Sequence, residues 1–136
     1  MGKEEKLEYQ LTGREKDILT ILWRANKGMI ASEITKELDD LTINTVQAVL
    51  KKLMKRNLIK IDQIVYSGTV LTRSYVPTLS EQEFETERIS ANIIDLERFN
   101  ISPAKFAMSF FSKSNAKISR EEAKELMALI KEHTEE

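Results

Sequence analysis

The sequence has no cysteine, and it has only one histidine, four glycines and two prolines. Without cysteine, the chain can form no disulfide, no thiolate metal site and no thiol redox switch. Glycine and proline at this low level favour helices over a fold built mainly from strands. The one histidine, His133, lies near the C-terminus, where chains tend to fray. We therefore expect no histidine-based catalytic triad, no metal site and no cofactor.

Long hydrophobic runs are also missing, since none approaches the roughly 18 residues that span a bilayer. Residues 1–10 mix both charges without an apolar stretch, which predicts a flexible segment and no secretion signal. Glycine-rich phosphate loops and the His-Glu-x-x-His metal motif are absent too. These absences predict a cytoplasmic protein that is not an enzyme.

The charges are distributed unevenly along the chain, although they sum to only −1. Residues 42–73 hold six basic side chains and one acidic side chain. A basic cluster in an otherwise acidic chain indicates a surface that faces a polyanion. On charge alone, an ordinary solvated helix face explains the cluster equally well. The elements around the cluster therefore have to decide between the two interpretations.

Two helices are predicted in the N-terminal part of the chain. Thr12 and Glu15 have the spacing of a capping box before an apolar run. Gly28 is expected to close the helix that they open. After a short apolar link at residues 29–30, Ser32 is expected to cap a second, shorter helix.

A third helix and a hairpin are predicted to follow. Thr42 is expected to cap this helix, and Asn57 is expected to end it. Two strands, at residues 58–66 and 70–76, are expected to flank a turn at Ser67-Gly68. The third helix has the clearest apolar periodicity in the chain, at Val46, Val49, Leu50 and Leu53.

Three more helices are expected in the rest of the chain. The first runs from Ser80 to about Arg98 and opens with a capping box. The second begins at Ser102-Pro103, because proline suits the first helical position. The third begins at Ser119, where another capping box is completed by Glu122.

The order of these elements predicts the fold class, which is mainly α with a small β wing. A short helix joined tightly to an amphipathic helix is the helix-turn-helix arrangement, and a hairpin directly after it is a wing. We therefore predict a winged helix-turn-helix domain at residues 11–77, after the flexible segment at residues 1–10. A helical dimerisation domain of three helices is predicted at residues 78–136.

The third helix has a polar face opposite its apolar stripe, and this face matches a DNA-reading surface. A recognition helix contacts base edges with its N-terminal residues, while the rest of the helix lies along the groove. Asparagine and glutamine suit adenine, and a threonine methyl group suits thymine. The expected base contacts come from Asn44, Thr45, Gln47 and Ala48. Lysine suits phosphate as a mobile point charge, and the expected phosphate contacts come from Thr42, Lys51, Lys52, Lys55 and Arg73.

A second interpretation is a winged-helix protein-interaction module that does not bind DNA, because a fold does not determine a function. Such a module should expose apolar or aromatic residues on its third helix. The amides and lysines on this face favour DNA, so we keep the protein-interaction module as the alternative.

The apolar residues of the C-terminal half predict a homodimer. They form stripes that are too apolar for the surface of a monomer, and one winged helix can bind only a short half-site. A ligand pocket among the phenylalanines is the alternative to packing, which is the usual role of aromatic clusters. The residues expected at the dimer interface are Ile93, Phe106, Phe110, Phe111, Leu126, Met127 and Ile130.

Five short motifs follow one another along the chain with a specific order and spacing. They are Leu11-Thr12…Glu15…Leu22-Trp23, Thr42-Ile43-Asn44-Thr45-Val46, Lys55-Arg56…Leu58-Ile59, Arg73-Ser74-Tyr75-Val76-Pro77 and Ser119…Glu122…Glu125-Leu126. In this order they resemble the penicillinase-repressor family, which includes the β-lactamase, methicillin-resistance and copper-responsive repressors. The resemblance extends from Leu11 over nearly the whole chain.

This resemblance implies a repressor that binds an inverted-repeat operator as a dimer and controls β-lactamase or related antibiotic-response genes. In the antibiotic-responsive members, a signal from a membrane sensor protease leads to cleavage of an Asn-Phe bond in the C-terminal domain. Alignment backwards from Ser119 places Ser109-Phe110 at that bond, with serine in place of asparagine. The copper-sensing cysteine motifs of other members are absent. A repressor of unrelated genes that a ligand releases is the other open possibility.

Overall fold

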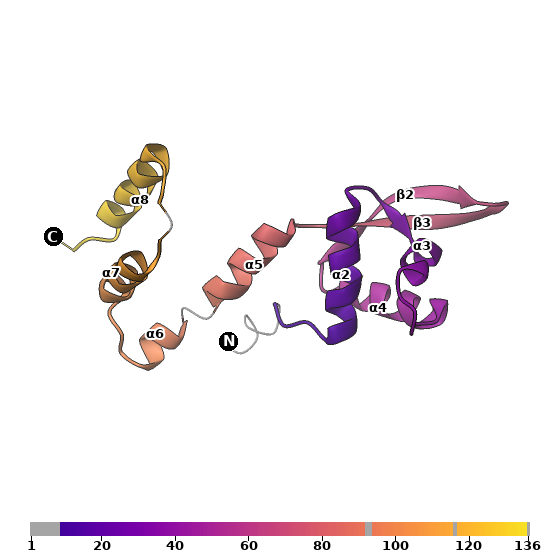
Figure 1. Cartoon of the computed structure of the whole chain (residues 1–136), viewed down its shortest axis with the longest axis horizontal. Helices are drawn as coiled ribbons and strands as arrows, with labels where there is room; N and C mark the ends of the chain where they lie inside the picture. Colours follow the sequence, from indigo (N-terminus) through magenta and orange to yellow (C-terminus); the bar gives the residue numbers. More distant parts are fainter. Residues whose placement is uncertain (1–8, 92–93, 116, 136) are drawn as a thin grey trace. The chain divides into compact units, whose positions relative to one another are not determined.

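The computed structural model of the chain describes residues 9–91, 94–115 and 117–135. It divides into two units, Met1–Ile94 and Asp95–Glu136. The described residues of the first unit form three helices, a small sheet and a fourth helix after the sheet (Figure 1). The second unit contains the remaining helices. Within the described residues, no helix is long and apolar enough to cross a membrane.

The first helix, α2 (Gly13–Ala25), opens with the predicted capping box. The Thr12 hydroxyl accepts a hydrogen bond from the Glu15 backbone N–H at 3.2 Å, and the Glu15 carboxylate accepts one from the Thr12 N–H at 2.9 Å. The helix ends earlier than predicted, because Asn26 takes the left-handed conformation with φ of 55°. The prediction that Gly28 closes this helix is therefore wrong.

Gly28 is needed for close packing instead. A Cβ atom at this position would lie 2.7 Å from Asp62 Oδ2 and 2.9 Å from Ser74 Oγ. Both distances are shorter than real Cβ contacts, so any larger residue would require the Asp62 carboxylate and the buried Ser74 side chain to move. This contact joins residues far apart in the sequence, which is why the local pattern could not indicate it.

The second helix, α3 (Ala31–Lys36), begins one residue before the predicted cap. The Glu33 carboxylate accepts a hydrogen bond from the Ile30 backbone N–H at 3.1 Å and so satisfies an N–H group at the helix start. Ser32 lies inside the first turn, and its prediction as the cap is wrong.

The third helix, α4 (Ile43–Lys55), is capped by Thr42, as predicted. Asn57 follows it in the left-handed conformation with φ of 58°, which confirms the predicted end. Its buried side chains are those of the predicted stripe, Val46, Val49, Leu50 and Leu53.

A three-stranded antiparallel sheet completes the winged helix. The strands β1 (Met29–Ile30), β2 (Ile59–Ser67) and β3 (Val70–Pro77) lie in the order β1-β3-β2. β2 and β3 form the predicted hairpin, which extends beyond the helices of this unit (Figure 1). Gly68 at its tip has φ of +66°, which suits glycine in a two-residue hairpin loop.

One hydrophobic core holds these elements together. α2 contributes Ile18, Leu19 and Leu22, and α3 contributes Ile34, each at most 1% exposed. The stripe of α4 packs into the same cluster, as do residues at the base of the hairpin. The core therefore buries the inner face of α4 and leaves its polar face outward.

The fourth helix of the first unit, α5 (Glu81–Ser90), packs on this core through Phe84, which is 2% exposed. The compact unit thus extends to Ile94, beyond the boundary predicted after residue 77. The predicted continuous helix to Arg98 is wrong, because α5 ends at Ser90 and a separate helix, α6 (Ile94–Arg98), follows. Ile93, predicted at the dimer interface, lies outside the described residues.

The second unit continues with α7 (Pro103–Lys113) and α8 (Arg120–Glu132). Both start where predicted, since Ser102 caps α7 and the box of Ser119 and Glu122 caps α8. Neither helix has a buried side chain. The exposed large apolar side chains of this unit are Phe99, Ile101, Phe106, Met108, Phe110, Phe111, Ile118, Met127, Leu129 and Ile130.

Candidate nucleic-acid interface

The polar face of α4 lies on the surface of the winged helix. The helix is amphipathic, so the core fixes its inner stripe and its rotation about its own axis is determined. With 13 residues, it is about 20 Å long. The side chains exposed on this face are Asn44, Gln47, Ala48, Lys51, Lys52 and Lys55.

The first turn of α4 differs in one respect from the predicted base-reading set. Thr45 is half-buried, and its hydroxyl lies 3.1 Å from the hydroxyl of Thr42. The Thr42 hydroxyl also accepts the Thr45 backbone N–H at 3.2 Å. The two threonines therefore use their hydroxyls for the cap, which leaves the Thr45 methyl group as the part of its side chain able to contact a base.

Ile43 was missed by the sequence reasoning. It is the first residue of α4 and is 43% exposed, next to Asn44. A branched apolar side chain exposed in the first turn of this helix can contact a thymine methyl group.

The later turns of α4 place positive charge on the same face. Lys51, Lys52 and Lys55 are all exposed, and the helix has no acidic residue. Arg73, the predicted phosphate ligand of the wing, is exposed on β3, where it pairs with Ile64 of β2. Among the described residues, no cluster of acidic or histidine side chains could hold a metal ion.

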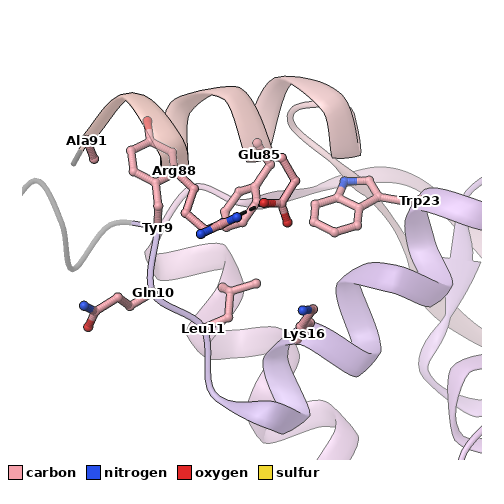
Figure 2. Close-up of a pocket in the computed structure, with 9 residues that line it drawn as sticks. Tyr9, Gln10, Leu11, Lys16, Trp23, Glu85, Arg88 and Ala91 are labelled. Carbon is pink, nitrogen blue, oxygen red and sulfur yellow. Dashed lines mark hydrogen bonds and ion pairs between the residues drawn. The ribbon is translucent and has the colours of Figure 1, made fainter. Parts of the chain in front are cut away.

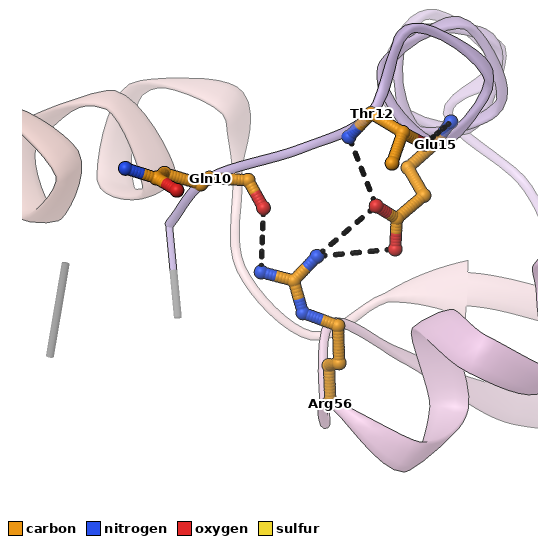
Figure 3. Close-up of polar contacts among 4 residues, drawn as sticks. All are labelled: Gln10, Thr12, Glu15 and Arg56. Carbon is orange, nitrogen blue, oxygen red and sulfur yellow. Dashed lines mark hydrogen bonds and ion pairs between the residues drawn. The ribbon is translucent and has the colours of Figure 1, made fainter. Parts of the chain in front are cut away.

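An ion pair fastens the C-terminal end of α4 to the start of α2 (Figure 3). The Arg56 Nη1 group donates to both carboxylate oxygens of Glu15, at 3.2 and 3.1 Å. Its Nη2 group donates to the Gln10 carbonyl oxygen at 2.7 Å. Glu15 therefore serves the capping box and the ion pair at once, and it joins α4 to α2.

The pKa of Glu15 reflects two opposing influences. Burial raises it, but the hydrogen bond from the Thr12 backbone and the nearby Arg56 guanidinium together lower it below its usual value. The carboxylate is therefore ionised at neutral pH, which is the state that the ion pair needs.

The pairing of β2 with β3 is irregular near the base of the wing. The register with β3 shifts between Ile61 and Ile64, which marks a β-bulge. The buried Ser74 hydroxyl on β3 accepts the Gln63 backbone N–H at 3.1 Å and donates to the Gln63 carbonyl oxygen at 3.3 Å. The Ser74 side chain thus satisfies both backbone groups of Gln63, which lies within the irregular part of β2.

The outer part of the wing is uncharged, since residues 64–72 contain no acidic or basic side chain. Tyr66, Val70 and Leu71 are more than half exposed there. Positive charge is therefore concentrated on α4. Along the sequence of the hairpin, Arg73 is the basic residue closest to the tip.

Comparison with known protein families gives a match to one family. A model described as penicillinase repressor matches residues 11–132 of the chain. This segment includes α4, the wing and the helices of the second unit. A comparison with curated proteins gives no match.

Comparison with solved structures gives similar folds. A point mutant of MepR from Staphylococcus aureus, bound to an oligodeoxyribonucleotide, is 19% identical with a TM-score of 0.50. The match covers 97% of this chain and 83% of that chain. Another MepR mutant, from a multidrug-resistant S. aureus clinical isolate, is 16% identical over the same shares with a TM-score of 0.46. At this identity, the first of these likenesses supports the fold alone.

Proposed function

The chain belongs to the penicillinase repressor family, and we propose that it represses transcription as a homodimer bound to an inverted-repeat operator. As a member of this family it is a DNA-binding transcriptional repressor. The observation that carries the proposal is the outward face of α4, with amides in its first turns and lysines in its later turns. The MepR mutant of similar fold is bound to an oligodeoxyribonucleotide, and double-stranded DNA is the partner that we propose here.

Base recognition is assigned to the first turns of α4. Asn44 and Gln47 are exposed and can each pair with the N6 and N7 atoms of adenine. Ala48 and the methyl group of Thr45 offer apolar contacts to thymine. These residues lie ahead of the lysines, as base-contacting residues do in a recognition helix that enters the major groove with its N-terminal end.

Phosphate binding is assigned to Thr42, Lys51, Lys52, Lys55 and Arg73. Phosphate contacts position the protein on the duplex and carry no sequence information. The Thr42 hydroxyl already accepts the Thr45 N–H, and its own proton can reach a phosphate when the Thr45 hydroxyl is the donor in the contact between the two hydroxyls. The chain thus separates the two tasks along one helix. A protein-interaction module would need an apolar α4 face, whereas Ile43 is the one large apolar side chain exposed on this helix.

The separation can be tested on an operator selected from random DNA by the wild-type protein. Gln47→Ala should weaken binding to this operator by about 1–3 kcal/mol and leave binding to unrelated DNA unchanged. Lys55→Ala should weaken binding to both DNAs alike and reduce the salt slope by about one unit. Lys124→Ala, at an exposed lysine of α8, serves as the charge-matched control.

The ratio of operator binding to random-DNA binding is the deciding measurement. If Gln47→Ala and Lys55→Ala lower both affinities in the same ratio, the assignment of the α4 face is wrong. If neither substitution changes binding to any DNA, the alternative of a protein-interaction module gains support.

Ile43 extends the proposed base-reading set by a contact to a thymine methyl group. Replacing single thymines of the operator with uracil removes that methyl and nothing else. The wild-type protein should lose affinity at one such position in each half-site, because an apolar contact is lost. Ile43→Ala should bind the thymine and uracil operators equally. A variant that still distinguishes them would show that another residue contacts the methyl group.

The homodimer is proposed from the second unit. Its long helices have no buried side chain, and ten of its large apolar residues are exposed. A surface of this kind normally marks an interface. The predicted residues Phe106, Phe110, Phe111, Met127 and Ile130 are all among them, and Leu126 is half-buried. Two winged helices could then bind half-sites about 34 Å apart, one turn of the duplex.

Induction is proposed to act on this second unit. The family resemblance points to cleavage between Ser109 and Phe110, after a signal from a membrane sensor protease. This bond lies within α7, where both residues are exposed. A protease must unwind a helix locally to cleave it, and α7 has no buried side chain to oppose unwinding. The genes proposed to be under control are those of β-lactamase or a related antibiotic response.

A further inference from the structure

A pocket of about 560 Å³ lies in the first unit, between α2, α5 and the segment before α2 (Figure 2). This volume is within the range of small-molecule sites, about 300–1,000 Å³. Its lining shares no residue with the polar face of α4. The pocket is therefore separate from the proposed DNA-binding surface.

The walls of the pocket are unusually aromatic for a chain with nine aromatic residues. Tyr9, Phe84 and Trp23 come from three different segments and form a row, with ring centroids 5.6 and 5.5 Å apart. Phe84 is buried, whereas Tyr9 and Trp23 keep part of their surface open. The Trp23 indole N–H donates to the Leu79 carbonyl oxygen at 2.9 Å, which fixes the plane of its ring. Fixed, partly open aromatic rings favour a planar apolar ligand that stacks on them.

The charges around the pocket favour an anion. Lys16 lines it from α2 and is exposed, and its ammonium group has no hydrogen-bond or ion-pair partner within the described part of the chain. On α5, Arg88 and Glu85 form an ion pair at 2.6 Å. The lining therefore contains two cations and one carboxylate, and the lysine ammonium is the cation that remains available to a ligand.

We propose that this pocket binds a small planar aromatic anion, whose ring stacks against Trp23 and Tyr9 and whose charge meets Lys16. Such a ligand would touch α2 and α5 together. The Glu15 side chain of α2 holds Arg56 at the end of the recognition helix, and α5 is the last complete helix before the second unit. The ligand would therefore act as an effector of DNA binding, a role that rests on the proposed function.

The pocket contains its own reporter, because Trp23 is the only tryptophan of the chain. The probe is 4-nitrobenzoate, a planar anion that quenches indole fluorescence, and its neutral analogue is 4-nitrobenzamide. Quenching of the full-length protein should saturate as 4-nitrobenzoate is added. It should also exceed the quenching of free N-acetyltryptophanamide, a control that corrects for light absorption and for collisional quenching. The amide should bind more weakly by up to about fivefold, which is the most that one solvent-exposed ion pair supplies.

Two surface substitutions test the role of charge without changing the rings. Lys16→Gln should weaken 4-nitrobenzoate binding by about fivefold and leave 4-nitrobenzamide binding unchanged. Glu85→Gln should strengthen binding of the anion, because it removes the carboxylate from the lining. Lys124→Gln is the matched control and should change neither. Unsaturable quenching, equal affinity for the two probes, or no effect of Lys16→Gln would each overturn the proposed site.

The effector role is tested by a separate measurement of operator affinity, whereas binding of the probe to the pocket is measured without DNA. Saturating 4-nitrobenzoate should change operator affinity of the wild-type protein by about fivefold or more, the lower range of allosteric coupling. At the same probe concentration, Lys16→Gln should show a smaller change. An unchanged wild-type affinity would overturn the effector role. Failure to bind any operator, with the probe still bound, would instead count against the proposed function.

Discussion

Replacing Arg56 with alanine should destabilise the winged helix by about 2 kcal/mol. An ion pair on the open surface contributes about 0–1 kcal/mol, and loss of one partner of a buried pair costs about 3–5 kcal/mol. Glu15 is 5% exposed, while the Arg56 side chain is 25% exposed. The pair therefore lies between these limits. The substitution also removes the hydrogen bond to the Gln10 carbonyl oxygen. Among the described residues, it leaves the Glu15 carboxylate with the hydrogen bond from the Thr12 N–H.

Urea unfolding of four proteins isolates this interaction. They are the wild type, Glu15→Gln, Arg56→Ala and the double variant, measured at pH 7 and at one protein concentration, since association shifts apparent stability. The loss of unfolding free energy in the double variant should be smaller than the sum of the losses in the two single variants, by about 1–2 kcal/mol. Arg24→Ala, at an exposed arginine of α2, is the control. A coupling energy near zero would refute the idea that the pair fastens α4 to α2.

The pH dependence supplies an independent check on the same pair. The pKa of Glu15 is lower in the folded state than in the unfolded state. At a pH between these two pKa values, the unfolded state therefore binds more protons than the folded state. The stabilisation is fully present at a pH above the ordinary pKa of about 4.5, and it is lost as the pH falls through the pKa of the folded state. The difference in stability between the wild type and Glu15→Gln should therefore shrink over this acidic range. A difference that stays constant down to low pH would contradict the assignment.

Two further predictions concern the second unit. Ile130→Asp should convert the proposed dimer into a monomer, because it places a carboxylate in an apolar interface. Analytical ultracentrifugation at tens of micromolar protein measures this change. Ala128→Asp, on the opposite side of α8, is the control and should leave the dimer intact. Mass spectrometry of the protein from its native host should detect cleavage between Ser109 and Phe110 after β-lactam exposure. An intact chain while the target genes are induced would rule out the proteolytic mechanism.

Local signals in the sequence predicted the helix starts well. The capping boxes at Thr12, Ser80 and Ser119 all form, because each depends on residues only three positions apart. The apolar stripe of α4 was predicted for a similar reason, since a period of 3.6 residues is a property of one helix. The polar face, and with it the residues expected to contact DNA, followed from that stripe.

Tertiary contacts explain what the sequence could not predict. The Glu15–Arg56 pair joins residues 41 positions apart, and Gly28 is required by the approach of Asp62 and Ser74. Neither leaves a local pattern. The prediction placed α5 outside the winged helix because the domain boundary was set at residue 77, where the hairpin ends, whereas Phe84 packs α5 against the core. The pocket beside it is built from three segments and was likewise invisible in the sequence.

The contrast between the two units gives the proposed regulation a physical basis. The first unit buries a core of its own, so its α4 face is formed whether or not a partner is present. Neither long helix of the second unit buries a side chain, and a segment that buries so little apolar surface cannot offset the entropy of ordering its backbone. Its order should therefore depend on association. Cleavage in α7 or loss of the partner would then separate the two half-site contacts, and the second contact would no longer be intramolecular. Repression would be lost while each winged helix stays folded.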